Sequence, residues 1–217
     1  MIKFYLDLET YRPNKKDAFL NEKIIALGLL IDFTSNMSVT PNEIKEYKWG
    51  DPIPSFGIWK YIETDENSSE DKNNPEKKII SRFYQLLDKF DDRKMIIGFN
   101  ILGFDIPLLV QRSKELNVRK IRDTNYFFFF NTFIVDYFQI CLPFNNMRFK
   151  GNDLENCARR IEEIKGRKIP FQKIGKGSEI ASLYDNKDYE GIKRHLESDL
   201  LITRAIDLAF IEHQSTT

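Results

Sequence analysis

The sequence predicts an α/β fold built on a mixed five-stranded sheet, in which three antiparallel strands are followed by parallel strands and helices flank the sheet. Two observations predict this class. Before Ile79 the chain contains apolar segments of strand length, whereas after it segments with a helical period alternate with short apolar ones. Strands that come first, followed by helices that alternate with strands, are typical of a mixed sheet covered by helices.

The three antiparallel strands are expected in the N-terminal part of the chain. Apolar and polar side chains alternate strictly from Ile2 to Glu9, which is the pattern of a strand with two different faces. Apolar runs follow at residues 23–33 and 44–49 after short polar connections, so these three segments should form a meander. Residues 63–78 contain no apolar residue apart from one proline, and we expect them to form a polar, disordered loop.

The remaining elements are expected to form a β-α-β-α pattern followed by further helices. In the expected helices the apolar residues recur at the spacing of one helical face, and the expected strands are short runs of apolar, aromatic or β-branched residues. Pro107 falls in the first turn of one helix, where a proline is tolerated. The helices are expected at residues 79–91, 106–116, 153–164 and 189–212, and the strands at residues 95–97 and 127–138.

The length and composition of the chain suit a single globular domain, expected to span residues 1–217. Lys plus Arg and Asp plus Glu both number 33, so any nucleic-acid surface must be local. Cys141 and Cys157 lack metal-ligand spacing, and we expect them to be buried small apolar residues of a reducing compartment rather than a disulfide. No segment has the length of a membrane span or the pattern of a signal peptide, so a soluble, cytoplasmic protein without a membrane partner is expected.

Three short motifs place acidic residues where chemistry could use them. Asp7 and Glu9 end the first strand and point to the same side of it, because they are two residues apart. Asp105 follows a buried strand at the start of a helix, and His195 and Asp199 share one face of a late helix. Hard cations such as Mg²⁺ and Mn²⁺ take several oxygen ligands, and clustered carboxylates suppress each other's ionisation unless a cation compensates.

Each motif taken alone also has an explanation without chemistry. Asp7 and Glu9 can mark a strand that emerges into solvent, and Asp105 can simply cap its helix. His195 and Asp199 can form a pair on a solvated helix face, worth a few tenths of a kcal/mol. The combination and the order of the motifs therefore carry more information than any one of them.

Together and in this order, the motifs resemble those of the DEDD exonucleases, the DnaQ-like group that includes the proofreading domains of DNA polymerases. That group has D-x-E after the opening strand, N-x(2–3)-F/Y-D next, and Y-x(3)-D or H-x(4)-D in a late helix. The segments GFNILGFDIPLL, DLENCA, GKGSEI and HLESDL also resemble predicted exonucleases related to the family B polymerase proofreading domain. The resemblance extends over residues 2–210 and implies an RNase H-like fold.

The resemblance implies a 3′→5′ exonuclease that removes nucleoside monophosphates from the 3′ end of single-stranded DNA. It implies two divalent metal ions, Mg²⁺ or Mn²⁺, that clamp the phosphodiester, activate water and stabilise the leaving 3′-oxygen. The metal ligands implied are the four acids Asp7, Glu9, Asp105 and Asp199. The substrate contacts implied are Leu8, Thr10, Asn100 and Phe104.

His195 departs from both forms of the third motif. Its three-residue gap to Asp199 is the spacing of the tyrosine form, whereas the residue is the histidine of the other form. One residue corresponds to about 100° around a helix, so His195 cannot be assumed to reach the attacking water. Two roles stay open, a general base and a residue that only positions water, and we favour water positioning with modest proton acceptance.

Three further features stay open between a functional and a structural role. Residues 148–176 carry nine Lys or Arg against four acids, and they can form a DNA-tracking rim or a solvated helix face. Asp136 can be an accessory acid, although a strand-end or capping role is the better interpretation. Residues 127–130, all Phe, are interpreted as core or a covered edge rather than a stacking platform.

Two other functions compete with a DNA exonuclease. An RNA-directed 3′→5′ exoribonuclease would use the same carboxylate chemistry on the other polymer. A non-catalytic nucleic-acid-binding or polymerase-accessory module would keep the fold, but loss of catalysis ordinarily removes acids and here all four are present. The sequence identifies no polymerase or repair partner.

Overall fold

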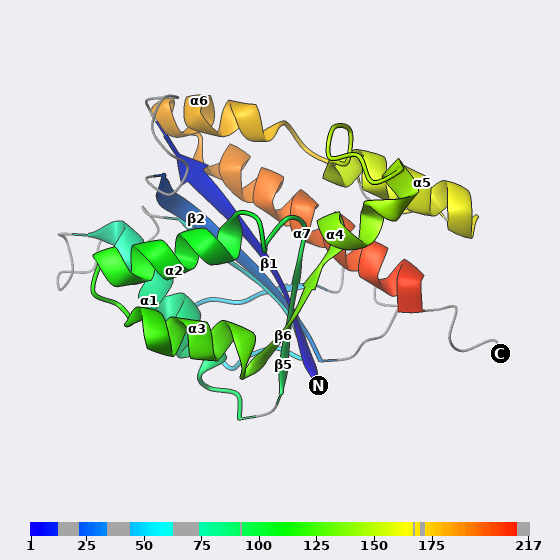
Figure 1. Cartoon of the computed structure of the whole chain (residues 1–217). Coiled ribbons are helices and arrows are strands. Elements are labelled where there is room, and N and C mark those ends of the chain that lie inside the picture. The colour runs from blue at the N-terminus through cyan, green and yellow to red at the C-terminus, as the bar shows by residue number, and fades with distance from the viewer. Residues whose placement is uncertain are drawn as a thin grey trace.

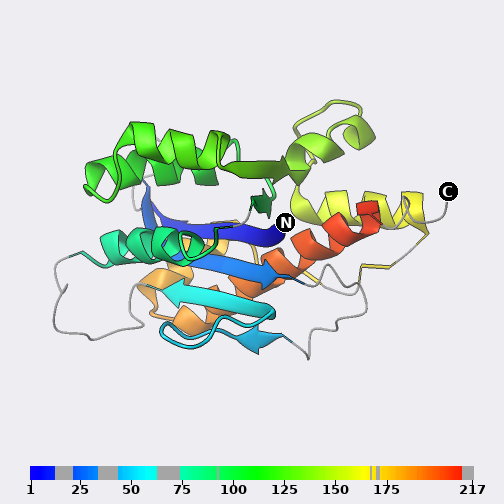
Figure 2. The same ribbon diagram turned by 90° about the horizontal axis from the view of Figure 1, so that it is seen from below.

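The computed structural model of the chain has a central mixed sheet with helices on both sides (Figures 1 and 2). It describes residues 1–12, 22–33, 44–62, 74–91, 93–166, 168–169 and 172–211. The strands are β1 (Ile2–Tyr11), β2 (Lys23–Asp32), β3 (Lys45–Glu46), β4 (Phe56–Ile62), β5 (Lys94–Gly98) and β6 (Thr132–Asp136). The helices are α1 (Pro75–Leu87), α2 (Asp105–Glu115), α3 (Ile121–Phe129), α4 (Tyr137–Cys141), α5 (Leu154–Lys165), α6 (Ile180–Asp185) and α7 (Tyr189–Ile211), with short 3₁₀ turns at Pro143–Asn145 and Gly177–Glu179.

The described strands form one six-stranded sheet in the order β3-β4-β2-β1-β5-β6. β2 is antiparallel to both of its neighbours, β1 and β4, whereas β5 and β6 continue the sheet parallel to β1. The predicted class, antiparallel strands followed by parallel strands, is therefore confirmed. The predicted count of five strands was wrong by one, because the two-residue strand β3 adds a short edge beside β4.

The third strand of the meander lies later in the chain than predicted. Residues 44–49 supply only β3, whose two residues, Lys45 and Glu46, are both exposed. The long partner of β2 is instead β4, with the sequence FGIWKYI, in which six of seven residues are buried. Two prolines precede β4, and the apolar run after them was the stronger strand signal.

The aromatic segment 127–138 is not one strand. Its first residues complete α3, and only Thr132–Asp136 form strand β6. Phe127 and Phe128 are buried and contact Tyr84 of α1, as the core interpretation expected, but Phe129 and Phe130 are exposed, at 55% and 78%. A run of four identical residues has no periodicity, so the sequence could not distinguish a helix from a strand here.

The expected polar loop is shorter than residues 63–78. Residues 63–73 lie outside the described part of the chain, but Asn74 caps α1 and Pro75 begins it, so residues 75–78 are helical. Glu76 is buried, receives the Arg112 guanidinium at 2.7 and 2.5 Å, and accepts the Ile24 N–H at 3.0 Å. The end of the expected loop is thus part of the packed structure.

The two faces of β1 belong to different halves of the core. Phe4, Leu6 and Leu8 pack with the buried side chains of α1, α2 and α3, whereas Tyr5 packs with those of α5 and α7. The alternation of β1 therefore directs Asp7 toward the α7 side of the sheet. This is the feature of the fold that positions the candidate site.

Cys141 and Cys157 are joined in a disulfide, so the prediction that they stay unpaired was wrong. Both side chains are buried, as predicted. Cys141 ends α4 and Cys157 lies in α5, and the packing of these helices brings the two Cα atoms to 6.1 Å, within the range for a disulfide. In the described part of the chain no helix is long and apolar enough to cross a membrane.

Candidate active site

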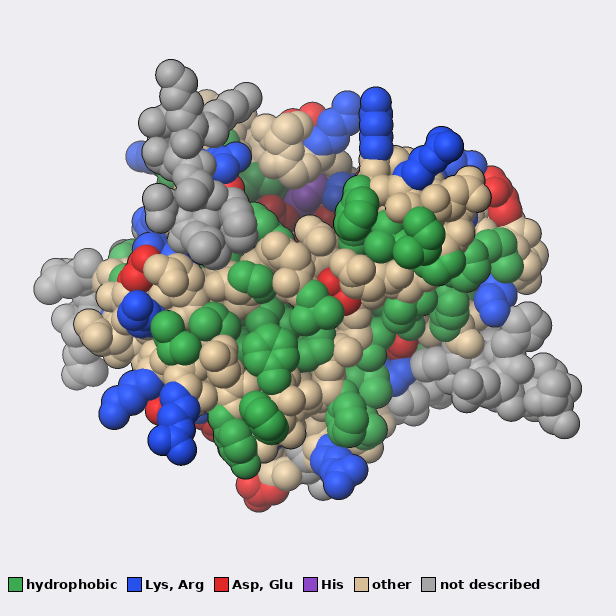
Figure 3. All heavy atoms as spheres, in the orientation of Figure 1, with side chains coloured by type: hydrophobic (Ala, Val, Ile, Leu, Met, Phe, Trp, Pro, Cys, Tyr) green, Lys and Arg blue, Asp and Glu red, His purple; other side chains and the backbone are tan. Residues whose placement is uncertain are grey.

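The three acidic motifs converge on one cleft of about 540 Å³. Figure 3 shows this hollow, with Asp, Glu and His side chains at its floor and Lys and Arg side chains along its rim. Asp7 comes from β1, Asp105 from the start of α2 and Asp199 from the middle of α7, and all three line the cleft. The fold thus brings together acids that lie far apart in the sequence.

Asp7 and Glu9 are carboxyl groups whose ionised form is disfavoured by burial and by neighbouring carboxylates. Burial raises the pKa of the Asp7 carboxyl well above its usual value, and the charges of Glu9, Asp199 and Asp105 raise it further. Burial likewise raises the pKa of Glu9, and Asp199 adds to the increase. Mutual repulsion of this kind favours a cation among the carboxylates.

Asp105 is the first residue of α2 and is 3% exposed. Its Oδ1 accepts the Leu8 backbone N–H at 3.0 Å, which ties α2 to β1. Burial raises the pKa of Asp105 to about 7, although hydrogen bonds from backbone N–H groups oppose the rise. Asp105 follows the N-cap residue, Phe104, and its carboxyl bonds to β1 and lines the cleft, so its role is not simply that of a helix cap.

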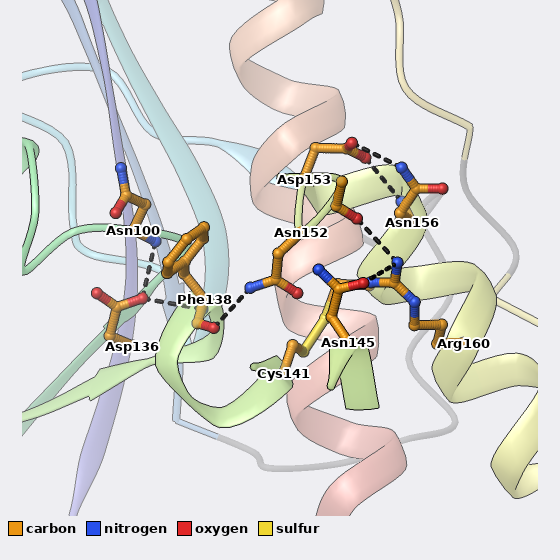
Figure 4. The surroundings of a disulfide bond; sticks show 11 residues. Asn100, Asp136, Phe138, Cys141, Asn145, Asn152, Asp153, Asn156 and Arg160 are labelled. Carbon is orange, nitrogen blue, oxygen red and sulfur yellow. Dashed lines mark hydrogen bonds between the residues drawn. A yellow bond between two sulfur atoms is a disulfide. The ribbon is translucent and has the colours of Figure 1, made fainter. Parts of the chain in front are cut away.

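Asp136 has the structural role that the sequence favoured. It is the N-cap of α4, where its Oδ1 accepts the Phe138 N–H at 2.9 Å. The same carboxylate accepts the N–H groups of Asn100 at 2.8 Å and Leu102 at 2.9 Å (Figure 4). Asp136 thus fixes the loop before Asp105, in which Asn100 takes a left-handed φ of 62°.

His195 lies inside the acidic cluster despite its unusual spacing. Its Nε2 is 3.4 Å from Glu9 Oε1 and 3.7 Å from Asp199 Oδ2. Its Nδ1 forms a hydrogen bond with the Ile174 carbonyl, so Nδ1 carries the proton and Nε2 faces the acids. The side chain is 3% exposed, and the departure from the family pattern has not carried it out of the site.

Lys173 is a site residue that the sequence did not single out. Its Nζ lies 2.5 Å from Asp199 Oδ2. Burial lowers the pKa of Lys173, but the charges of Asp199, Asp7 and Glu9 outweigh that effect and raise it overall. Among the described residues that line the cleft, Lys173 is the one cation.

The segment that carries Lys173 is held against α7. Ser198 Oγ accepts the Ile174 N–H at 3.1 Å and donates to the His195 carbonyl at 2.7 Å. In the sequence, only its position in the basic stretch 148–176 pointed to Lys173. The basic residues of that stretch do not all face the cleft. Arg160 is occupied by hydrogen bonds to its own loop, at 2.8 and 2.9 Å, rather than by the cleft.

The four residues expected to contact substrate do not all lie in the cleft. Leu8, Asn100 and Phe104 line it. Thr10 is not among the described lining residues and donates its hydroxyl to Glu22 instead. Thr10 thus lies outside the described lining of the cleft, next to a bulge between Glu9 and Thr10 that interrupts the register of β1 with β2, and its contact with substrate stays a prediction.

Residues 55–216 match the model of the family described as "Predicted 3'-5' exonuclease related to the exonuclease domain of PolB". The chain belongs to this family. The match includes Asp105 and Asp199, whereas Asp7 and Glu9 precede it. No curated protein matches the chain.

The fold agrees with this family. The chain is similar to the solved structure of the family B DNA polymerase from the hyperthermophilic archaeon Pyrobaculum calidifontis, with a TM-score of 0.60 and 16% sequence identity. The similarity covers 99% of this chain, so it includes β1, and 24% of the polymerase chain. The predicted RNase H-like fold is therefore confirmed for this predicted exonuclease, and the chain corresponds to about a quarter of the polymerase.

The donor set of this family member fits hard divalent cations. Asp7, Glu9, Asp105 and Asp199 offer carboxylate oxygens, which Mg²⁺ and Mn²⁺ prefer, and burial together with neighbouring carboxylates raises the pKa of Asp7, Glu9 and Asp105. As the described side chains are placed, no three from His, Cys, Asp and Glu stand close enough together to hold a metal ion. The described side chains therefore have the right chemistry for metal ligands, but the carboxylates would have to move closer together to bind one ion.

The raised pKa of Asp105 predicts that the metal-free protein becomes less stable as the pH rises. The folded carboxyl keeps its proton up to about pH 7, whereas the unfolded one loses it near pH 4, so folding binds the proton in this window. The free energy of unfolding should fall by a few kcal/mol between these values. The melting temperature in EDTA, measured from about pH 5 to pH 8, checks this.

Asp105→Asn is the control, because the amide oxygen still accepts the Leu8 N–H but cannot ionise. Its melting temperature should depend less steeply on pH than that of the wild type. A steeper fall in the variant would show that the burial of Asp105 is not the cause.

Proposed function

We propose that the chain is a metal-dependent 3′→5′ exonuclease that hydrolyses phosphodiester bonds from the 3′ end of single-stranded DNA and releases nucleoside monophosphates. The observation that carries the proposal is the convergence of acids from β1, α2 and α7 on one cleft, with His195 among them. Membership of a family of predicted 3′→5′ exonucleases supports the same reaction class. A cleft of about 540 Å³ has the size of a small-ligand site, which suits a terminal nucleotide.

Two divalent cations, Mg²⁺ or Mn²⁺, would be held by the carboxylates of Asp7, Glu9, Asp105 and Asp199. When bound, they would supply Lewis-acid activation of water and compensation of charge on the leaving 3′-oxygen. Burial raises the pKa of the Asp7 and Asp105 carboxyls, so binding of cations would be accompanied by release of protons from them.

His195 can hold and partly deprotonate the attacking water. The Ile174 carbonyl fixes its ring through Nδ1, so Nε2 faces Glu9 and Asp199. Lys173 contributes differently, since its ammonium group neutralises Asp199 before a cation arrives. It also places a positive charge in the cleft that can bind the scissile phosphate.

His195→Ala should lower the cleavage rate by about ten- to a hundredfold, less than the loss of an acid, because the metal ligands remain. His195→Tyr should retain much of the activity, since its hydroxyl can orient water from a similar place. Initial rates on a single-stranded oligonucleotide at saturating Mn²⁺ check this order. Wild-type activity in His195→Ala would remove His195 from the reaction.

The choice of polymer is tested by rates on matched DNA and RNA oligonucleotides of the same sequence. The proposal predicts faster release of mononucleotides from DNA. Faster release from RNA would make the chain an exoribonuclease with the same acids. Binding of both polymers with no metal-dependent turnover would favour a non-catalytic module instead.

A further inference from the structure

A row of phenylalanines leads away from the acids along the cleft. Phe99, Phe138 and Phe149 line the same cleft as Asp7 and Asp105, and we call them the phenylalanine track. Phe99 and Phe138 meet edge to face, with ring centroids 5.7 Å apart, and Phe138 and Phe149 are tilted by 33° with centroids 5.7 Å apart. The three rings therefore form a continuous row of contacts that ends at Phe149.

The outer part of the track is not hydrophobic core. Phe149 is 69% exposed, and Phe138 is half-buried. Large aromatic side chains gain most by burial, so an exposed one beside a polar cleft calls for a reason. Figure 3 shows hydrophobic side chains on the surface around the acidic hollow.

The loop that carries Phe149 is braced. The buried Asn152 donates from Nδ2 to the Phe138 carbonyl at 2.9 Å (Figure 4). Arg160 Nη2 donates to Asn145 Oδ1 at 2.8 Å and to the Gly151 carbonyl at 2.9 Å. These bonds hold both ends of the loop against α4 and α5, so the exposed ring is presented from a fixed support.

The disulfide strengthens this support. It joins Cys141, three residues after Phe138 in the chain, to Cys157 of α5 (Figure 4). A ring held in place loses little further freedom when a flat ligand stacks on it. The bracing is thus what a preorganised stacking surface requires.

The charge around Phe149 indicates the ligand. Arg148 and Lys150 flank it in the sequence and are both exposed, and Lys173 lies deeper in the same cleft. Aromatic rings in a groove that leads to a reaction centre, with cations beside them, are the kind of surface that binds a single nucleic-acid strand through base stacking and phosphate contacts. A protein partner has no flat bases and regularly spaced phosphates for such a surface to match.

We propose that the phenylalanine track stacks on the bases that lie upstream of the terminal nucleotide, while Arg148 and Lys150 bind their phosphates. The inference rests on the proposed function, because the acids define where the 3′ end lies. The track would bind the strand through its bases without sequence preference, since every base offers a flat face. Longer single strands should therefore bind more tightly than a mononucleotide.

The experiment measures binding of a fluorescein-labelled oligothymidylate by anisotropy in EDTA, where no turnover occurs. Phe149→Ala should weaken binding about 5- to 150-fold, the loss expected for one stacked base. Phe149→Trp should restore it. Phe130→Ala is the matched control, because Phe130 is 78% exposed but lies in another part of the surface, and it should bind as the wild type does.

Wild-type binding in Phe149→Ala, equal weakening in Phe130→Ala, or no binding of the strand by the wild type would each overturn the proposal. A rate measurement separates it from the proposed function. With the p-nitrophenyl ester of thymidine 5′-monophosphate, which has no upstream bases, Phe149→Ala should react as the wild type does, whereas KM on the oligonucleotide should rise. If the wild type hydrolyses nothing yet Phe149→Ala still loses binding, the track stands and the exonuclease proposal fails.

Discussion

Asp7→Ala should lower the cleavage rate by at least about a hundredfold, and the same loss is expected on replacing Glu9, Asp105 or Asp199. Each acid would ligate a shared pair of cations, so that loss of one displaces both, and errors of about an ångström in position cost on the order of a hundredfold. At Asp7 the variant should be as stable as the wild type or more so. Its carboxyl pKa is raised by burial and by Glu9, so removing it relieves repulsion.

The four replacements should differ in stability although they agree in activity. Asp105→Ala leaves the Leu8 N–H without its acceptor, and Asp199→Ala leaves Lys173 without its partner, so each should lose about 1–3 kcal/mol. Melting temperatures and initial rates on one labelled oligonucleotide check both statements. Glu163→Ala, in an exposed pair with Arg159, is the control that should change neither. Near-normal activity in any acid variant would remove that acid from the ligand set.

Asp207→Ala should cause the largest loss of stability, about 3–5 kcal/mol in the free energy of unfolding. The buried Asp207 accepts hydrogen bonds from Lys3 Nζ at 2.6 Å, Tyr5 at 2.7 Å and Tyr137 at 2.7 Å. Its removal leaves a buried ammonium and two buried hydroxyls without a partner. Because these bonds join α7 to β1, the variant should also lose activity by misaligning Asp199 and Asp7.

Thermal unfolding of Asp207→Ala should show a melting temperature lower by roughly 6–20 °C, since 1 kcal/mol corresponds to about 2–4 °C in a domain of this size. Lys3→Met with Asp207→Leu is the informative double variant, because it removes the buried charge together with its partner and should recover part of the loss. A melting temperature of Asp207→Ala within a degree or two of the wild type would show that the network contributes little.

The side of a strand or helix on which these residues lie could be predicted from the sequence, because it follows from regular periods, whereas their role as metal ligands came from the family resemblance and stays a prediction. A two-residue period put Asp7 and Glu9 on one side of β1, and a helical period put His195 and Asp199 on one face of α7. What the sequence could not give was the distance from His195 to Glu9, since β1 and α7 lie far apart in the chain.

Features that depend on packing between distant elements were missed or wrongly predicted. The Cys141–Cys157 disulfide depends on how α4 packs against α5, which no sequence period encodes. Lys173 lies in a segment without regular structure, so no pattern directed its side chain toward Asp199. The exposure of Phe149 was also missed, because a single aromatic residue in a sequence is ordinarily assigned to the core.

The most direct test of the central claim is the product pattern on a 5′-labelled single-stranded DNA oligonucleotide with Mg²⁺ or Mn²⁺, alongside EDTA and Asp7→Ala. The cluster of Asp7, Glu9, Asp105 and Asp199 predicts a ladder that shortens by one nucleotide at a time from the 3′ end, only with metal and only in the wild type. Discrete internal cuts, or a ladder that persists in EDTA or in Asp7→Ala, would contradict it.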